Sequence, residues 1–129
     1  MKLLLDTCAL LYSTLTPDKL SGRVKQALQD SDTEVFVSII SAGEIACNYG
    51  KKIHLDRHWK TWFRERCAVQ QWNLLNVDLD IIEEAYSLPD PFHRDPADRI
   101  LVATSRIKRI PLVTNDTLIT NYPHVNIFW

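Results

Sequence analysis

Short apolar runs alternate with longer amphipathic stretches along the whole chain. Apolar runs of this length are typical of buried strands, and apolar residues at helical spacing indicate helices between them. The stretch 18–30 shows the helical pattern, with one apolar face formed by Leu20, Val24, Ala27 and Leu28. The pattern predicts strands at 3–5, 34–40, 73–77, 111–114 and 125–129, and helices at 18–30, 41–49, 57–69, 79–88, 96 to 108 or 109, and 117–121.

Local signals mark several of the expected helix ends. Gly50 is placed to end the second helix, and Asp56 to cap the third. Pro96 follows Asp95 and suits the first helical position, where its fixed backbone angle is favourable. Strands separated by helices imply parallel crossover connections. The sequence therefore predicts one α/β domain over residues 1–129, with ligands bound at the carboxyl ends of the strands.

Composition narrows the class of protein without naming a function. The chain has 129 residues, 46% apolar and 24% charged, which suits one globular core. A net charge of -1 excludes a strongly basic nucleic-acid-binding module. Cys8, Cys47 and Cys67 show no disulfide or zinc spacing, so a reducing, cytoplasmic location is expected. No apolar run approaches the length of a membrane span.

Four acidic residues are expected at the carboxyl edge of the predicted sheet. Asp6 and Asp116 follow strands, and Glu44 and Asp98 lie in the first turns of helices. Four carboxylates in one small site repel one another unless a cation is present. Mg²⁺ or Mn²⁺ suits carboxylate oxygens, and such an ion commonly serves phosphoester hydrolysis.

Each acid also has a structural interpretation. Glu44 closes a Ser-x-x-Glu pattern typical of a capping box. Asp98 lies where a carboxylate favours the helix dipole, and Asp116 suits a turn. Asp6 is the hardest to explain in this way, because an acid that ends a parallel strand has few structural partners. Asp95 is expected to be a helix cap rather than a member of the site.

The segments around these acids resemble PIN-domain nucleases, and most closely the VapC-type toxins of toxin–antitoxin pairs. The matching segments are Leu4–Thr7, Ser41–Ile45, His93–Leu101, Leu112–Asp116 and Tyr122–Trp129. Their order and spacing extend the resemblance over essentially the whole chain. It implies a PIN-like three-layer sandwich, in which helices flank a parallel five-stranded sheet of order 3-2-1-4-5.

The resemblance also implies an activity, a site and partners. VapC-type toxins are endoribonucleases that depend on Mg²⁺ or Mn²⁺ and act on tRNA or other translation-related RNA. Their acidic residues correspond to Asp6, Glu44, Asp98 and Asp116, as metal ligands and catalytic groups. Thr7 corresponds to the hydroxyl residue beside the first acid and is expected to contact RNA. A small cognate antitoxin and a second copy in a homodimer are the implied partners.

Charge is segregated along the chain despite the neutral total. Residues 51–66 hold six basic and two acidic residues, and residues 78–98 hold seven acidic and one basic. Basic patches contact phosphates largely without sequence preference. Lys51, Lys52 and Arg99 are nearest in sequence to the acids and are expected to bind RNA, with solvated helix faces as the alternative. The histidines are expected at the surface: His54, His58, His93 and His124.

Trp59, Trp62 and Phe63 lie at helical spacing on one predicted helix. A core position is the ordinary interpretation of such spacing. The alternative is a partly exposed groove that receives a helix of the antitoxin.

A second class of function stays open at this stage. The chain could be a non-hydrolytic module that binds RNA or protein, in which the acids only cap helices; such a module would not bind metal. Phospho-receiver domains and Asp-x-Asp phosphatases fit poorly, because the position that needs their second acid is Cys8.

Overall fold

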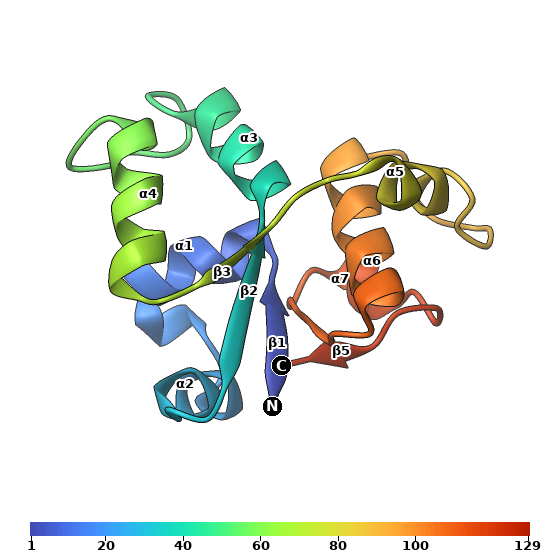
Figure 1. Ribbon diagram of the computed structural model, residues 1–129, viewed down its shortest axis with the longest axis horizontal. Coiled ribbons are helices and arrows are strands. Elements are labelled where there is room, and N and C mark those ends of the chain that lie inside the picture. Colours follow the sequence, from blue (N-terminus) through green and yellow to red (C-terminus); the bar gives the residue numbers. More distant parts are fainter.

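Five short strands form one parallel sheet in the order β3-β2-β1-β4-β5 (Figure 1). The computed structural model describes all 129 residues. The strands are β1 (Lys2–Leu5), β2 (Glu34–Ser38), β3 (Asn73–Leu75), β4 (Leu112–Val113) and β5 (Ile127–Phe128). Every pairing between neighbouring strands is parallel. The fold and strand order expected from the sequence are therefore confirmed.

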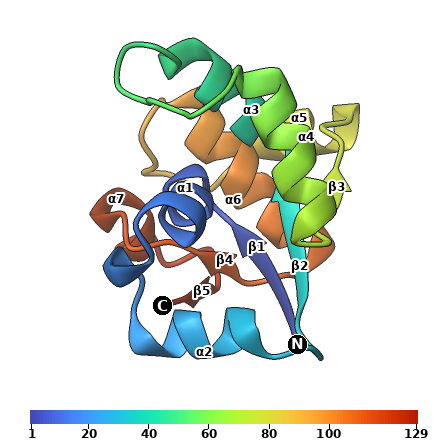
Figure 2. The same ribbon diagram turned by 90° about the vertical axis from the view of Figure 1, so that its left-hand side faces the viewer.

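Helices cover both faces of this sheet and make a three-layer sandwich. They are α1 (Thr7–Leu15), α2 (Gly22–Gln29), α3 (Ile39–Asn48), α4 (Trp59–Val69), α5 (Leu79–Ala85), α6 (Pro96–Lys108) and α7 (Thr117–Thr120), with a short 3₁₀ helix at Pro17–Lys19. Figure 1 shows α1, α3 and α4 on one side of the sheet and α5, α6 and α7 on the other. Figure 2 shows α2 below the amino ends of the strands. No helix has the length and apolar content to cross a membrane.

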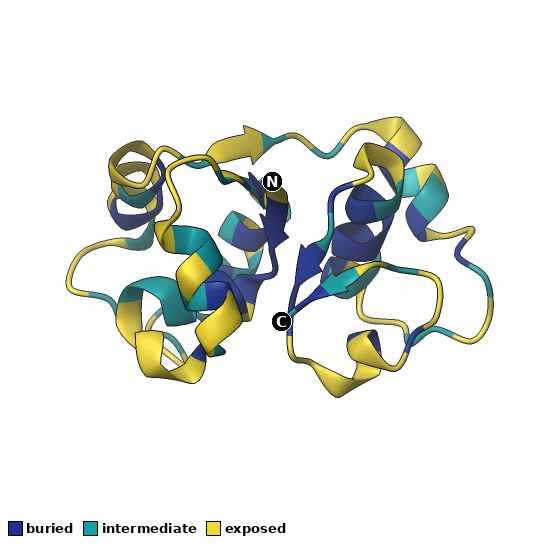
Figure 3. Ribbon diagram, turned by 90° about the horizontal axis from the view of Figure 1, so that it is seen from below, coloured by how far each residue is buried: buried dark blue, intermediate teal, exposed yellow.

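The alternation of side chains along β1 builds two separate cores. Leu3 and Leu5 pack with residues of α1 to α4 in the larger cluster. Leu4 points the other way and packs with Leu101 and Leu112 on the side of α6. Successive residues of a strand face opposite sides of the sheet, so three buried leucines in a row serve both layers. Figure 3 shows the buried residues concentrated in the central strands and in α6.

Several local expectations differ from the structure. The helix expected at 18–30 is α2, which begins only at Gly22, and the helix expected at 79–88 ends at Ala85. No helix was expected at residues 7–15, yet α1 begins there with Asp6 as its N-cap. Helix α3 begins two residues early because Ser38, at the end of β2, accepts a hydrogen bond from the Ile40 N–H. Helix α4 begins after His58, whose Nδ1 accepts from the Lys60 N–H, so Asp56 is not its cap.

The aromatic residues of α4 belong to the core. Trp62 and Phe63 are 2% and 5% exposed and pack in the larger cluster. Trp59 is half-buried against the same cluster. The predicted antitoxin groove at Trp59, Trp62 and Phe63 is therefore wrong for Trp62 and Phe63, because both side chains are buried in the core of this chain.

Replacing Trp62 with alanine should lower the free energy of unfolding by about 3–5 kcal/mol, the usual loss for a large buried aromatic side chain. Trp59→Ala is the matched control on the same helix and should lower it clearly less, because that side chain is only half-buried. Urea unfolding followed by circular dichroism measures both. Equal losses would contradict this assignment of the core.

Candidate active site

Asp6 lies directly after β1, at the edge where the strands end. Its Oδ1 accepts a hydrogen bond of 2.6 Å from the Ala9 N–H and so caps α1. Asp6 therefore has a structural role as a cap, which was not expected from the sequence. The residue is 5% exposed, and burial raises the pKa of its carboxyl to about 6. Hydrogen bonds from Thr114 and Ala9 act against that rise, whereas the charges of Glu44 and Asp116 add to it.

Glu44 projects from the middle of α3 and is held by a hydroxyl pair. The Thr7 hydroxyl donates to Glu44 Oε1 and lies 2.9 Å from the Ser41 hydroxyl. Because Thr7 has one hydroxyl proton, Ser41 must be the donor in the second contact. Glu44 therefore does not close a capping box with Ser41, and that structural interpretation is wrong. Thr7 is buried and positions Glu44, so the structure gives it a different role from the expected RNA contact.

Asp98 lies in the first turn of α6, and Asp95 is the cap of that helix. Asp95 Oδ1 accepts hydrogen bonds from the Ala97 and Asp98 N–H groups, which confirms its expected role. Asp98 Oδ2 lies 3.1 Å from Nε2 of His93. The contact is not aligned as a hydrogen bond, and this buried nitrogen has no other partner. His93 therefore faces the acids, although the sequence placed it among the surface histidines.

Asp116 caps α7 and is the most exposed of the four acidic residues. Its Oδ1 accepts a hydrogen bond of 2.8 Å from the Leu118 N–H. Its own N–H donates to the hydroxyl of Thr114, the buried residue at the end of β4 that also bonds Asp6. Thr114 thus connects two of the acids, a role that its position after a strand could have suggested.

The electrostatics show that the four carboxylates share one neighbourhood. Burial, and then the charges of Asp95, Asp116, Glu44 and Asp6, together raise the pKa of Asp98 to about 7. The pKa of Cys8 rises to about 11, first through burial and then through the same acids. None of Asp6, Glu44, Asp98 and Asp116 forms an ion pair with lysine or arginine. No lysine or arginine therefore neutralises these carboxylates directly.

The donor set fits a hard divalent cation. Carboxylate oxygens are the ligands that Mg²⁺ and Mn²⁺ prefer. Glu44 and Asp116 each use one oxygen in a hydrogen bond and keep the other for a ligand. As placed, however, no three acidic, histidine or cysteine side chains converge closely enough to hold an ion. Binding would require the carboxylates to approach one another, which their mutual repulsion opposes without a cation.

Arg99 has a structural role in the fold. Its guanidinium donates to the carbonyl oxygens of Ala85, Phe92 and His93 at 2.9–3.0 Å. This clamp joins the start of α6 to the loop that precedes it. The structure therefore gives Arg99 a different role from the expected contact with RNA.

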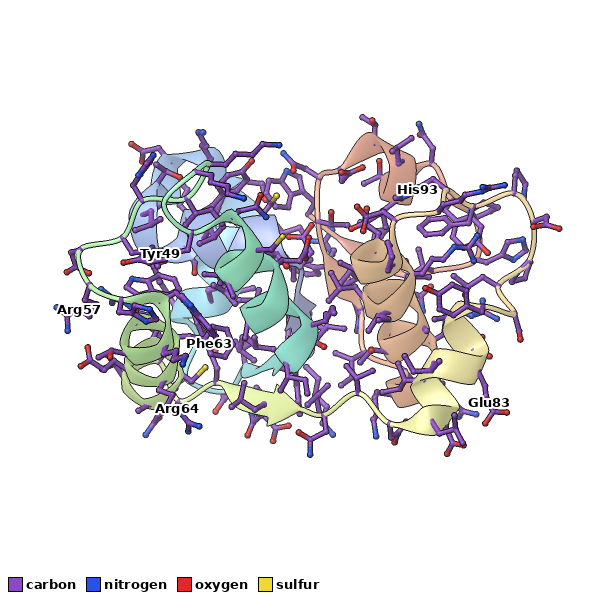
Figure 4. All side chains as sticks on the ribbon, turned by 90° about the horizontal axis from the view of Figure 1, so that it is seen from above. Tyr49, Arg57, Phe63, Arg64, Glu83 and His93 are labelled. Atoms are coloured by element: carbon purple, nitrogen blue, oxygen red, sulfur yellow. The ribbon has the colours of Figure 1, made fainter.

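Most basic residues of 51–66 are exposed or paired with other acids. Lys51 and Lys52 are exposed in the turn after α3. Arg57 pairs with Asp56 and Glu65. Figure 4, seen from above the strand ends, shows Arg57 and Arg64 at the opposite end of the molecule from His93. The basic stretch of α4 is therefore not part of the acidic site.

The largest cavity lies away from the four acidic residues. It has a volume of about 570 Å³ and lies at the amino ends of β2 and β3, where Val35 and Asn73 line it. It contains none of the four acids. The acids, at the carboxyl ends of the strands, mark the candidate active site, in agreement with the rule for open α/β sheets.

Comparison with known proteins agrees with this geometry. A family model described as PIN domain matches residues 3–125. The chain belongs to the PIN-domain family. The acidic edge of this PIN domain is formed by elements from both ends of the matched region, from β1 to α7.

Relatives extend over nearly the whole PIN domain. It is 28% identical over 122 residues to Ribonuclease VapC22 of Mycobacterium tuberculosis (strain ATCC 25618 / H37Rv), covering 94% of this chain and 92% of that protein. A toxin–antitoxin complex from Klebsiella pneumoniae contains a chain with a TM-score of 0.64 at 24% identity, covering 95% and 93%. The structure of VapBC2 from Rickettsia felis, bound to a promoter DNA fragment, matches with a TM-score of 0.72 at 13% identity and covers 100% of this chain and 99% of that one. These two structures support the fold.

The raised pKa values predict how stability depends on pH. Asp6 and Asp98 bind protons more tightly in the folded chain, where their pKa values are about 6 and about 7, than in the unfolded chain, where an aspartate has a pKa of about 4. The folded state therefore takes up protons between about pH 4 and 7, and the free energy of unfolding without metal should fall as pH rises through that window.

Urea unfolding at several pH values in EDTA measures this slope. Asp6→Asn removes one of the two titrating groups while keeping an amide oxygen to cap α1, so its slope should be shallower. Stability that rises over the same window in the wild-type protein would contradict the burial assigned to these carboxyls.

Proposed function

We propose that this PIN domain is an endoribonuclease that depends on Mg²⁺ or Mn²⁺ and hydrolyses phosphodiester bonds of RNA. The observation that carries the proposal is that Asp6, Glu44, Asp98 and Asp116 lie at one edge of the sheet, with no lysine or arginine paired to any of them. The name of the VapC22 relative, a ribonuclease, supports RNA as the substrate.

Asp6, Asp98 and Asp116 would hold the metal ion, with Glu44 beside it. When bound, Mg²⁺ or Mn²⁺ supplies activation of water and stabilisation of the charge that develops on the phosphate. The caps at Asp6 and Asp116 keep these side chains at the edge where the substrate arrives. A carboxylate that already bonds one backbone N–H is fixed in orientation before the ion binds.

Glu44 is suited to orient the attacking water and to accept its proton. The Thr7 hydroxyl holds Oε1, which leaves Oε2 for the water. Burial raises the pKa of Glu44, the Thr7 hydroxyl lowers it and the charge of Asp95 raises it again. A raised pKa makes a carboxylate a better base near neutral pH.

RNA would approach through contacts outside the acidic cluster. Lys51 and Lys52 are exposed and follow the helix that carries Glu44, so they are placed to contact phosphates away from the cleaved bond. Transfer RNA or another translation-related RNA is the proposed target, as the resemblance to VapC-type toxins implies.

The proposed partners are a small cognate antitoxin and a second copy of the chain. Solved structures of the same fold are toxin–antitoxin complexes, which supports an antitoxin. Exposed apolar side chains at Ile39, Leu74 and Leu79 supply a partner surface in place of the α4 groove. Ile39 and Leu74 lie close together, because Ser38, before Ile39, pairs with Leu75, after Leu74.

Removing single charges from the acids should abolish cleavage and leave the fold intact. Asp6→Asn, Glu44→Gln and Asp98→Asn should each lower the rate of RNA cleavage by at least about a hundredfold, because each removes charge that acts in the transition state. Their melting temperatures should hold or rise, because repulsion is relieved. Cleavage of total RNA and thermal melting measure the two effects.

Asp95→Asn is the matched control at the same helix start. Asparagine caps a helix nearly as well as aspartate, so both stability and cleavage should be close to normal. Loss of cleavage in Asp95→Asn with normal cleavage in Asp98→Asn would show that the third acid has been assigned to the wrong position.

Metal binding separates the nuclease from a module whose acids only cap helices. Titration calorimetry at pH 7.5 should detect Mn²⁺ or Mg²⁺ binding by the wild-type protein and much weaker binding by Asp6→Asn, and EDTA should stop cleavage. Absence of binding at millimolar concentrations of either ion would favour the non-hydrolytic module.

A further inference from the structure

A second cavity opens directly beside the acidic cluster. It has a volume of about 430 Å³, within the range of small-molecule sites. One wall is the loop Pro91–His93 and the other is formed by residues of α7 and the turn after it. His93 contacts Asp98 at 3.1 Å, and Thr117 follows Asp116, so the cavity adjoins the acids on two sides.

The lining of this cavity suits an uncharged, flat group. It contains no lysine, arginine, aspartate or glutamate. Phe92, Leu118 and Tyr122 supply apolar surface, and Leu118 is 59% exposed there. Thr117 and Asn121 add groups that both donate and accept hydrogen bonds. A phosphate would find no lysine or arginine in such a cavity, only His93, whereas a nucleobase has a flat face to stack and polar edges to pair.

We propose that this cavity binds a nucleobase of single-stranded RNA that flanks the cleaved phosphodiester bond. The inference rests on the proposed nuclease function and adds a base-binding site to it. The base lies between the Phe92 side of the cavity and Leu118, with its edge toward Asn121. The acids and the base site are adjacent, so one RNA strand occupies both.

The cavity is built before RNA arrives. The Tyr122 hydroxyl donates a hydrogen bond of 2.6 Å to the carbonyl of Pro89, which ties the two walls together. The rings of Phe92 and Tyr122 lie 4.5 Å apart. Arg99 holds the carbonyl of Phe92 from the other side. A preformed site loses little conformational freedom when it binds a base.

The test measures the contribution of a base rather than activity alone. The Asp6→Asn variant, which should bind RNA without cleaving it, is titrated with an oligoadenylate of about eight nucleotides and with an abasic oligomer of the same length. Fluorescence anisotropy gives the two dissociation constants. Their ratio should be about fivefold to a hundredfold in favour of the oligoadenylate, the range of base stacking on aromatic side chains.

Phe92→Leu and Leu118→Ala, each added to Asp6→Asn, should bring this ratio toward one. Leu118 is exposed, so its substitution leaves the fold intact. Tyr86→Leu is the matched control. The Tyr86 and Phe92 rings lie at similar distances from Arg99, 5.8 Å and 5.7 Å. Of the two rings, only Phe92 lines the cavity. This control should keep the full ratio.

An unchanged ratio in both Phe92→Leu and Leu118→Ala overturns the base site. So does a ratio of one in the Asp6→Asn background. A third outcome is that the variants show the expected ratios while the wild-type protein cleaves no RNA with Mn²⁺. That result contradicts the proposed nuclease function and supports the base site.

Discussion

Uncompensated negative charge at the carboxyl edge of the sheet is the constraint on which the rest of this structure depends. Asp6 and Asp116 cap helices, and Asp98 lies in a first turn. A helix N-terminus stabilises a nearby carboxylate by about 0.3–1 kcal/mol. That is too little to offset burial, since the pKa values of Asp6 and Asp98 rise to about 6 and about 7. Protons or a cation must supply the remaining stabilisation, so the edge is built to bind positive charge.

Capping and ligand binding are compatible roles for one carboxylate. From the sequence alone, a cap and a catalytic acid were competing interpretations of the same residue. Asp116 shows why they need not compete, because Oδ1 accepts the Leu118 N–H while the second oxygen stays free of protein hydrogen bonds. Asp95 fits the structural role that was expected, because one of its oxygens accepts two backbone N–H groups at the start of α6.

The sequence predicted the elements that are marked by a short apolar run or by apolar residues at helical spacing. The strands follow from such runs, and Asp95-Pro96 marks the start of α6. The order of the strands came from the resemblance to PIN-domain nucleases. Helix α1 was missed because its apolar residues surround the helix: Leu10 is buried, and Leu15 is exposed. A residue's partner in space is not encoded by spacing. For that reason the hydroxyl pair at Glu44 and the contact of His93 with Asp98 required the structure.

Arg99 shows how the fold couples the acids to the neighbouring cavity. A basic residue beside an acidic site suggested a phosphate contact, but its guanidinium holds three carbonyl oxygens of the α5–α6 segment. Two of these belong to Phe92 and His93, the residues that face the cavity and Asp98. Arg99 and Asp98 are consecutive in α6, so one helical turn sets the position of both. The spacing between the proposed cleavage site and the proposed base site is therefore fixed by the helix start and not by a flexible loop.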